Sequence, residues 1–175
     1  MNTTAVAPYE FTRTWTFEAS PANVFRAWTD PDRLGWFYND AQPIPTEPIE
    51  VDLRVGGVWR QLMVISEQTS YYTGGVYREI VSDEKLAFSW GAVDGWPELD
   101  PDRPEDSPLV TVTFSPTGRG TELRLNVKLP EGAARDRLGN FWPHAIQNGW
   151  GDTVDRLTGQ ILIRPPAPPE RPSTT

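Results

Sequence analysis

The sequence contains no cysteine and only one histidine among its 175 residues. Without cysteine the chain can form neither a disulfide nor a thiolate metal site, and it cannot use a cysteine nucleophile. A single histidine, His144, excludes a histidine cluster for a metal ion and a pair of catalytic histidines. We therefore expect neither a metal site nor a cofactor.

Positive charge is scarce and long apolar runs are missing. The chain has 16 basic and 24 acidic residues, which gives a formal net charge of −8. Nucleic acids and anionic membranes are bound chiefly through basic patches, so we expect neither as a partner. No window approaches the ~18 apolar residues of a membrane span, and the N-terminus lacks a signal-peptide pattern. These absences predict a cytoplasmic protein.

The familiar catalytic motifs are also missing, since the sequence has no Gly-x-Ser-x-Gly elbow, phosphate loop or dinucleotide glycine pattern. His144 alone could act as a base, because imidazole titrates near neutrality; the alternative is a surface or packing histidine. Four carboxylates occur on predicted strands opposite the apolar positions, which indicates solvated faces: Glu50, Asp52, Glu79 and Glu122. The sequence therefore favours a protein that is not an enzyme.

The clearest feature that is present is a long amphipathic helix near the C-terminus, between residues 140 and 163. Apolar residues recur there at helical spacing and form one stripe: Ile146, Trp150, Val154, Leu157 and Ile161. Pro143 should lie in the first turn of this helix or kink it. We expect the rest of the chain to cover the apolar stripe.

Most of the chain before residue 130 alternates with the period of two that is typical of strands. We predict strands over residues 11–18, 49–54, 58–65, 71–81, 86–90, 110–114 and 122–129. Gly56 and Gly57 predict a hairpin turn, residues 66–70 a polar turn, and Gly74 and Gly75 a bulge or bend. Ser20-Pro21 and Asp30-Pro31 are helix-start signals, because the first residue caps free N–H groups and proline tolerates the first turn.

This order of elements predicts an α+β fold. A curved antiparallel sheet of six to seven strands should wrap around the long C-terminal helix, with two short helices after the first strand. We expect one domain over residues 11–163, a flexible lead-in over 1–10 and a disordered proline-rich tail over 164–175. Residues 91–107 read as a solvated acidic loop rather than a calcium loop, because they lack EF-hand spacing. Trp96 in this loop is either a lid or an anchor.

Four segments in order carry a family likeness: ASPANVFRAWTDP (residues 19–31), VDLRVGGVW (51–59), GGVYREI (74–80) and GWGDTVDRL (149–157). Together they resemble bacterial single-domain proteins related to the C-terminal domain of the activator of heat-shock protein 90 ATPase, in the START-like helix-grip superfamily. The resemblance implies an apolar cavity between sheet and helix, and functions that range from ligand binding to cyclase-like chemistry. Two departures are the missing N-terminal domain of the eukaryotic co-chaperone and the longer, more acidic segment 91–107.

The eight tryptophans suggest what would line such a cavity, because tryptophan combines a large apolar ring with one N–H donor. The alternative is that they fill the core completely. The candidate ligand-binding residues are Trp36, Trp59, Met63, Tyr77, Phe88, Trp90, Trp142, Ile146 and Trp150, with His144 as a possible polar contact.

Three functions follow from these observations. The first is binding of a small hydrophobic or aromatic molecule between the sheet and the C-terminal helix. The second is a cyclase- or hydrolase-like enzyme that acts on a polyketide-like substrate through His144 or an inward carboxylate. The third is a co-chaperone or protein-interaction module that acts through its acidic surface. A homodimer through a sheet edge or the acidic loop is compatible with each.

Overall fold

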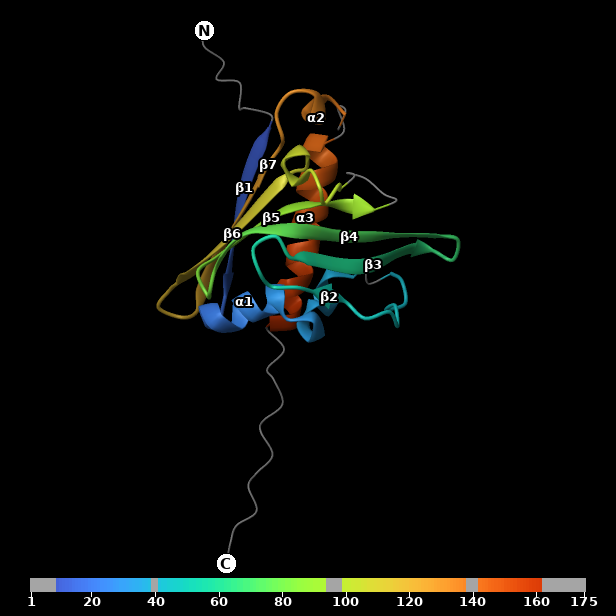
Figure 1. Ribbon diagram of the computed structural model, residues 1–175. Coiled ribbons are helices and arrows are strands. Elements are labelled where there is room, and N and C mark those ends of the chain that lie inside the picture. The colour runs from blue at the N-terminus through green and yellow to red at the C-terminus, as the bar shows by residue number, and fades with distance from the viewer. Residues whose placement is uncertain (1–8, 39–40, 94–98, 138–141, 162–175) are drawn as a thin grey trace, which may run out of the picture.

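A computed structural model describes residues 9–38, 41–93, 99–137 and 142–161 (Figure 1). The helical elements are α1 (Pro21–Thr29), the 3-10 helices η1 (Pro31–Phe37) and η2 (Pro104–Asp106), α2 (Ala133–Asp136) and α3 (Trp142–Ile161). The strands are β1 (Glu10–Phe17), β2 (Glu50–Val51), β3 (Val58–Ser66), β4 (Thr69–Val81), β5 (Lys85–Val93), β6 (Leu109–Pro116) and β7 (Thr121–Lys128). Among these elements no helix combines the length and the apolar character that a membrane crossing requires.

The strands form one antiparallel sheet of seven strands in the order β1-β7-β6-β5-β4-β3-β2. The sheet curves around α3, and α1 and η1 lie near one end of that helix (Figure 1). The first strand is brought beside the last one, since β1 pairs with β7 along its whole length. The predicted α+β helix-grip architecture is confirmed, including the two short helices after the first strand.

The alternating patterns explain how the core forms. In β7, Leu123, Leu125 and Val127 are completely buried, whereas the residues between them face outward. The apolar stripe of α3 meets this face, with Ile146, Trp150, Val154 and Leu157 all 2% exposed or less. A helix stripe and a one-sided sheet face bury each other because neither can remain in water without a large hydrophobic penalty.

The two helix-start signals behave as predicted. The Ser20 side chain accepts a hydrogen bond of 3.3 Å from the Asn23 N–H, and the Asp30 carboxylate accepts one of 2.9 Å from the Asp32 N–H. The second helix is a 3-10 helix rather than an α-helix. Its Trp36 side chain donates a hydrogen bond of 2.8 Å to the Ala27 carbonyl, which ties η1 back onto α1.

Several predicted boundaries are wrong. Strand β2 covers only two of the expected residues 49–54, because Asp52–Gly57 closes into a turn in which the Gly57 N–H donates to the Arg54 carbonyl. Gly56 has a φ of 84° there, a conformation that glycine adopts readily. The polar turn at 66–70 is shorter than expected, since β3 ends at Ser66 and β4 begins at Thr69.

Parts of the segment predicted as an acidic loop form regular secondary structure. Strand β5 runs to Val93, Leu99 is buried and hydrogen bonds to the Ala92 carbonyl, and η2 follows. The short helix α2 was not predicted. Glu10, which was predicted to belong to the lead-in, is the first residue of β1. Trp96, the first eight residues and the predicted tail lie outside the described residues.

Of the bulge or bend predicted at Gly74 and Gly75, the bulge is wrong. Both glycines pair in regular register with β3 and β5, and the bulge occurs instead between Tyr77 and Glu79. The glycines serve close approach between strands: a Cβ at Gly75 would lie 2.7 Å from the Ser89 carbonyl oxygen and 2.9 Å from the Phe88 ring. The absence of a side chain at Gly75 therefore leaves space for the Ser89 carbonyl and the Phe88 ring. It does not serve an unusual backbone conformation, because φ at Gly75 is not positive.

Arg156 on α3 fixes the helix against η1. Its Nε donates to the Trp36 carbonyl at 3.0 Å, and its Nη2 donates to the Phe37 carbonyl at 3.1 Å and to the Thr153 hydroxyl at 3.3 Å. These bonds satisfy carbonyl groups at the end of a 3-10 helix, which have no partner within the helix itself. The Arg156 guanidinium thus fixes the backbone at Trp36 and Phe37 against α3.

We expect Gly75→Ala to lower the free energy of unfolding by about 1–3 kcal/mol, because the added Cβ overpacks a site without free space. Gly35→Ala is the matched control, since a Cβ at Gly35 meets nothing within 4 Å. The measurement is urea unfolding followed by tryptophan fluorescence. Equal stability of the two variants would contradict the close-approach role of Gly75.

We expect Arg156→Met to lower the free energy of unfolding by about 2 kcal/mol, because it removes three hydrogen bonds of a partly buried charged group. Methionine keeps the apolar part of the side chain. Arg26→Met on the exposed face of α1 is the control and should change stability by less than about 0.5 kcal/mol. Both variants can be compared by the same denaturant titration; similar losses would rule out the anchoring role.

Candidate ligand-binding cavity

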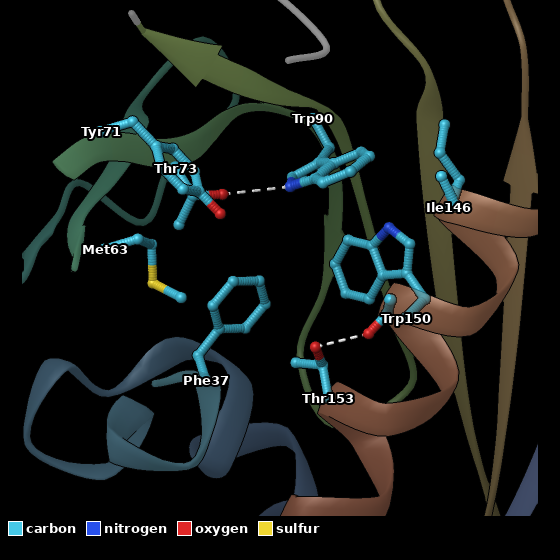
Figure 2. Close-up of a pocket in the computed structure, with 10 residues that line it drawn as sticks. Phe37, Met63, Tyr71, Thr73, Trp90, Ile146, Trp150 and Thr153 are labelled. Carbon is cyan, nitrogen blue, oxygen red and sulfur yellow. Dashed lines mark hydrogen bonds between the residues drawn. The ribbon is translucent and has the colours of Figure 1, made fainter. Parts of the chain in front are cut away.

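A cavity of about 270 Å³ lies between α3, the end of η1 and strands β3 to β5 (Figure 2). Its volume is just below the usual range of small-molecule pockets, about 300–1,000 Å³, and so suits a molecule of one or two rings. The lining residues are Phe37, Met63, Tyr71, Thr73, Trp90, Ala145, Ile146, Gly149, Trp150 and Thr153. Ala145 and Gly149 are exposed to solvent and form part of its rim.

Strand register brings the sheet side of the cavity together. Met63 of β3 pairs with Tyr71 of β4, and two residues further along β4 Thr73 points to the same face. Trp90 of β5 pairs with Gly75, which has no side chain to compete with the large indole ring. Three adjacent strands therefore contribute aromatic rings, a thioether and hydroxyl groups that face α3 (Figure 2).

The helix side depends on the 3.6-residue repeat of α3. Ile146, Trp150 and Thr153 follow one another at spacings of four and three, so they lie on one face of the helix. Ala145 and Gly149 lie beside them and are small. Large and small residues thus alternate along this wall. The small residues leave open space, and the large residues form its edges.

Trp150 is the centre of the aromatic packing. Its ring stacks on Trp28 at 6.2 Å between centroids and makes edge contacts with Phe37 at 5.7 Å and Trp90 at 5.2 Å, and Phe88 lies at 6.2 Å. Its Nε1 is buried without a hydrogen-bond partner in the described part of the chain. In Figure 2 this nitrogen lies on the edge of the indole that faces the Trp90 ring.

The polar groups of the cavity are few and mostly paired. Trp90 Nε1 donates to the Thr73 hydroxyl at 3.2 Å, and the Thr153 hydroxyl donates to the Gly149 carbonyl at 2.6 Å. Burial raises the pKa of the Tyr71 hydroxyl, which therefore stays protonated around neutral pH. Among the described residues, no lining side chain carries a charge. The described walls can accordingly offer a ligand hydrogen bonds, but they supply no ionic partner.

Four of the candidate binding residues line this cavity: Met63, Trp90, Ile146 and Trp150. Four others lie in the surrounding core and do not line it: Trp36, Trp59, Tyr77 and Phe88, each 5% exposed or less. The Trp59 ring, for example, packs edge-on against Phe37 at 4.9 Å and Phe88 at 5.7 Å. The side chains of Trp142 and His144 lie outside the described residues.

Six lining residues were not among the candidates: Phe37, Tyr71, Thr73, Ala145, Gly149 and Thr153. A sequence signal existed for most of them. Tyr71 and Thr73 have the same parity as Tyr77 on β4 up to the bulge, and Ala145, Gly149 and Thr153 are spaced by four along α3. These five residues are small or polar, so a search for large apolar side chains does not find them.

Groups for metal binding or acid–base chemistry do not meet in the described cavity. Across residues 9–38, 41–93, 99–137 and 142–161, no three His, Cys, Asp or Glu residues lie close enough to hold a metal ion. The carboxylates expected on solvated faces are exposed, as predicted: Glu50, Asp52, Glu79 and Glu122. Tyr71 is the titratable group among the described lining residues.

A larger hollow of about 520 Å³ lies elsewhere, between η2, β5 and the segment after β7. It is lined by charges of both signs, among them Arg78, Lys128, Glu105 and Glu131. Its size exceeds that of the cavity beside α3, but its mixed charges are typical of a solvated surface depression. We therefore place the candidate site beside α3.

Comparison with solved structures identifies the same fold in several bacterial proteins. A Rhodobacter sphaeroides protein superposes with a TM-score of 0.68 at 22% identity, covering 89% of this chain and 93% of that chain. A Mycobacterium smegmatis protein gives 0.68 at 16% identity, with 89% and 92% covered. The AHSA1-like protein of Aeromonas hydrophila gives 0.64 at 20% identity, with 87% and 93% covered.

No curated protein matches the sequence. The family model described as "Activator of Hsp90 ATPase homolog 1-like protein" matches residues 18–161, which include α1, the strands β2 to β7 and α3. The matched region contains all ten residues that line the cavity. The chain therefore belongs to the family of Activator of Hsp90 ATPase homolog 1-like proteins, as the resemblance of its four sequence segments predicted.

Proposed function

We propose that this protein binds a small hydrophobic or aromatic molecule in the cavity between the sheet and α3. The observation that carries the proposal is the composition of the walls: Phe37, Met63, Trp90 and Trp150 surround a hollow in which no described lining residue is charged. Apolar walls with a few placed polar groups are typical of small-molecule sites. An aromatic ligand would complete the ring packing around Trp150.

Binding without catalysis accounts for these walls better than an enzyme does. A cyclase or hydrolase needs an acid or base next to its substrate. Among the described lining residues the titratable group is Tyr71, and burial raises its pKa, which weakens it as an acid near neutral pH. The exposed carboxylates of the strands face solvent.

The family name suggests a co-chaperone role. A co-chaperone would contact its partner protein through its surface, and the cavity would have no function in that contact. It predicts salt-sensitive binding to a protein partner, because exposed charges are screened by salt. The neutral cavity is the observation that favours small-molecule binding over this alternative.

We expect Gly149→Leu to weaken binding of naphthalene and 2-naphthol by about tenfold or more, which corresponds to about 1.4 kcal/mol. Gly149 lines the cavity, and a Cβ there meets nothing within 4 Å, so the leucine side chain can extend into the open space. The measurement is equilibrium dialysis of the purified protein against each compound.

Gly159→Leu is the matched control. It lies on the same helix with the same open surroundings, but it does not line the cavity, so its affinities should remain within about twofold of the parent. Both variants should fold, since leucine is a better helix former than glycine by up to about 1 kcal/mol. A parent protein that binds neither compound, or a Gly149→Leu protein that binds both unchanged, would refute the proposed function.

A further inference from the structure

Most hydrogen-bonding groups of the cavity already have partners within the protein. The Trp90 N–H donates to Thr73, and the Thr153 hydroxyl donates to the Gly149 carbonyl while it accepts from Arg156. The Trp150 N–H has no hydrogen-bond partner in the described part of the chain, but it is buried out of reach of water. A ligand in the cavity would therefore find little free polar capacity on the α3 and β5 walls.

The β4 wall is different. The Tyr71 hydroxyl makes no hydrogen bond with any described residue, although the side chain is partly buried and lines the cavity. Thr73, two residues along the same face, uses its oxygen to accept from Trp90, so its hydroxyl hydrogen remains available. Both side chains project from the same face of β4 and line the cavity (Figure 2).

A charged ligand would be disfavoured in this environment. Transfer of an ionised carboxylate from water to an apolar site without a partner carries a large desolvation penalty. The lining residues that the structure describes offer no counter-charge, and the rings of Phe37, Trp90 and Trp150 occupy much of the wall. An uncharged ligand with a single polar group avoids this penalty, provided that the polar group meets the β4 wall.

We propose that the cavity selects uncharged aromatic molecules of one or two rings that carry one hydroxyl or carbonyl group, and that Tyr71 is the specificity-determining residue. The ring system packs among Phe37, Met63 and Trp150, and the polar group hydrogen bonds to the hydroxyls of Tyr71 and Thr73. This inference rests on the proposed function and adds the chemical class of the ligand. Sites built around a hydrogen bond reject analogues that cannot make it, because their own buried polar groups are then left unpaired.

The test is a comparison of 2-naphthol, naphthalene and 2-naphthoate with the parent protein and with Tyr71→Phe, by equilibrium dialysis at neutral pH. Tyr71→Phe removes only the hydroxyl. We expect it to weaken 2-naphthol binding by about three- to tenfold, the usual range for one hydrogen bond, and to leave naphthalene binding within about twofold. The parent should bind 2-naphthoate at least about tenfold more weakly than 2-naphthol.

Tyr72→Phe is the matched control, because it makes the same change one residue along the chain. The Tyr72 side chain lies on the opposite face of β4, where its hydroxyl bonds to Glu47 at 3.0 Å and the Arg60 guanidinium stacks on its ring at 3.7 Å. It does not line the cavity, and its affinities for the three compounds should equal those of the parent.

Two results would overturn the inference while leaving the proposed function intact. One is 2-naphthol binding that is equal in Tyr71→Phe and in the parent. The other is 2-naphthoate binding as tight as that of 2-naphthol, a comparison that depends on no variant. A parent that binds neither naphthalene nor 2-naphthol would instead refute the proposed function, and the ligand class with it.

Discussion

The packing of one tryptophan side chain sets the geometry of this protein. Trp150 contacts rings from α1, η1 and β5, and it is 2% exposed. A buried tryptophan removes roughly 150–250 Å² from water, equivalent to about 4–6 kcal/mol before the entropic terms. Close-packed rings tolerate little displacement. The packing of Trp150 therefore fixes the rotation of α3 and its distance from the sheet. These two quantities determine where the helix wall and the sheet wall of the cavity lie.

The cavity exists because the residues around Trp150 differ in size. Ala145 and Gly149 on α3 and Gly75 on β4 occupy little volume, whereas Phe37 and Trp90 are held in place from behind. Trp90 is fixed by its bond to Thr73, and the backbone of Phe37 is fixed by Arg156. Walls that are fixed before a ligand arrives reduce the entropy lost on binding.

The fold alone does not choose a function, because related scaffolds support different activities. The lining residues are more informative than the scaffold. The described lining residues carry no charge, and the hydroxyls of Tyr71 and Thr73 lie on one wall; these two features are the basis of the proposed ligand chemistry. The similarity to solved structures at 16–22% identity concerns the backbone, whereas the ligand chemistry depends on these side chains.

The sequence by itself determined the order of the strands and of the main helices, but not the short helices α2 and η2. Hydrophobic alternation located the strands, the spacing of Ile146, Trp150, Val154 and Leu157 located α3, and Ser20 and Asp30 located two helix starts. These signals are local, because side-chain direction repeats every two residues in a strand and every 3.6 in a helix. Boundaries were less well determined where a turn competed with a strand, as at Asp52–Gly57.

Only the tertiary structure decided which inward-facing residues border open space. Trp59, Tyr77 and Phe88 face inward as their parity predicts, yet they pack in the solid core, whereas Tyr71 and Thr73 further along β4 line the cavity. Parity gives the face of a sheet but not the distance to the helix above it. That distance depends on strand register, on close approach at Gly75 and on the seating of Trp150, all of which join residues far apart in the sequence.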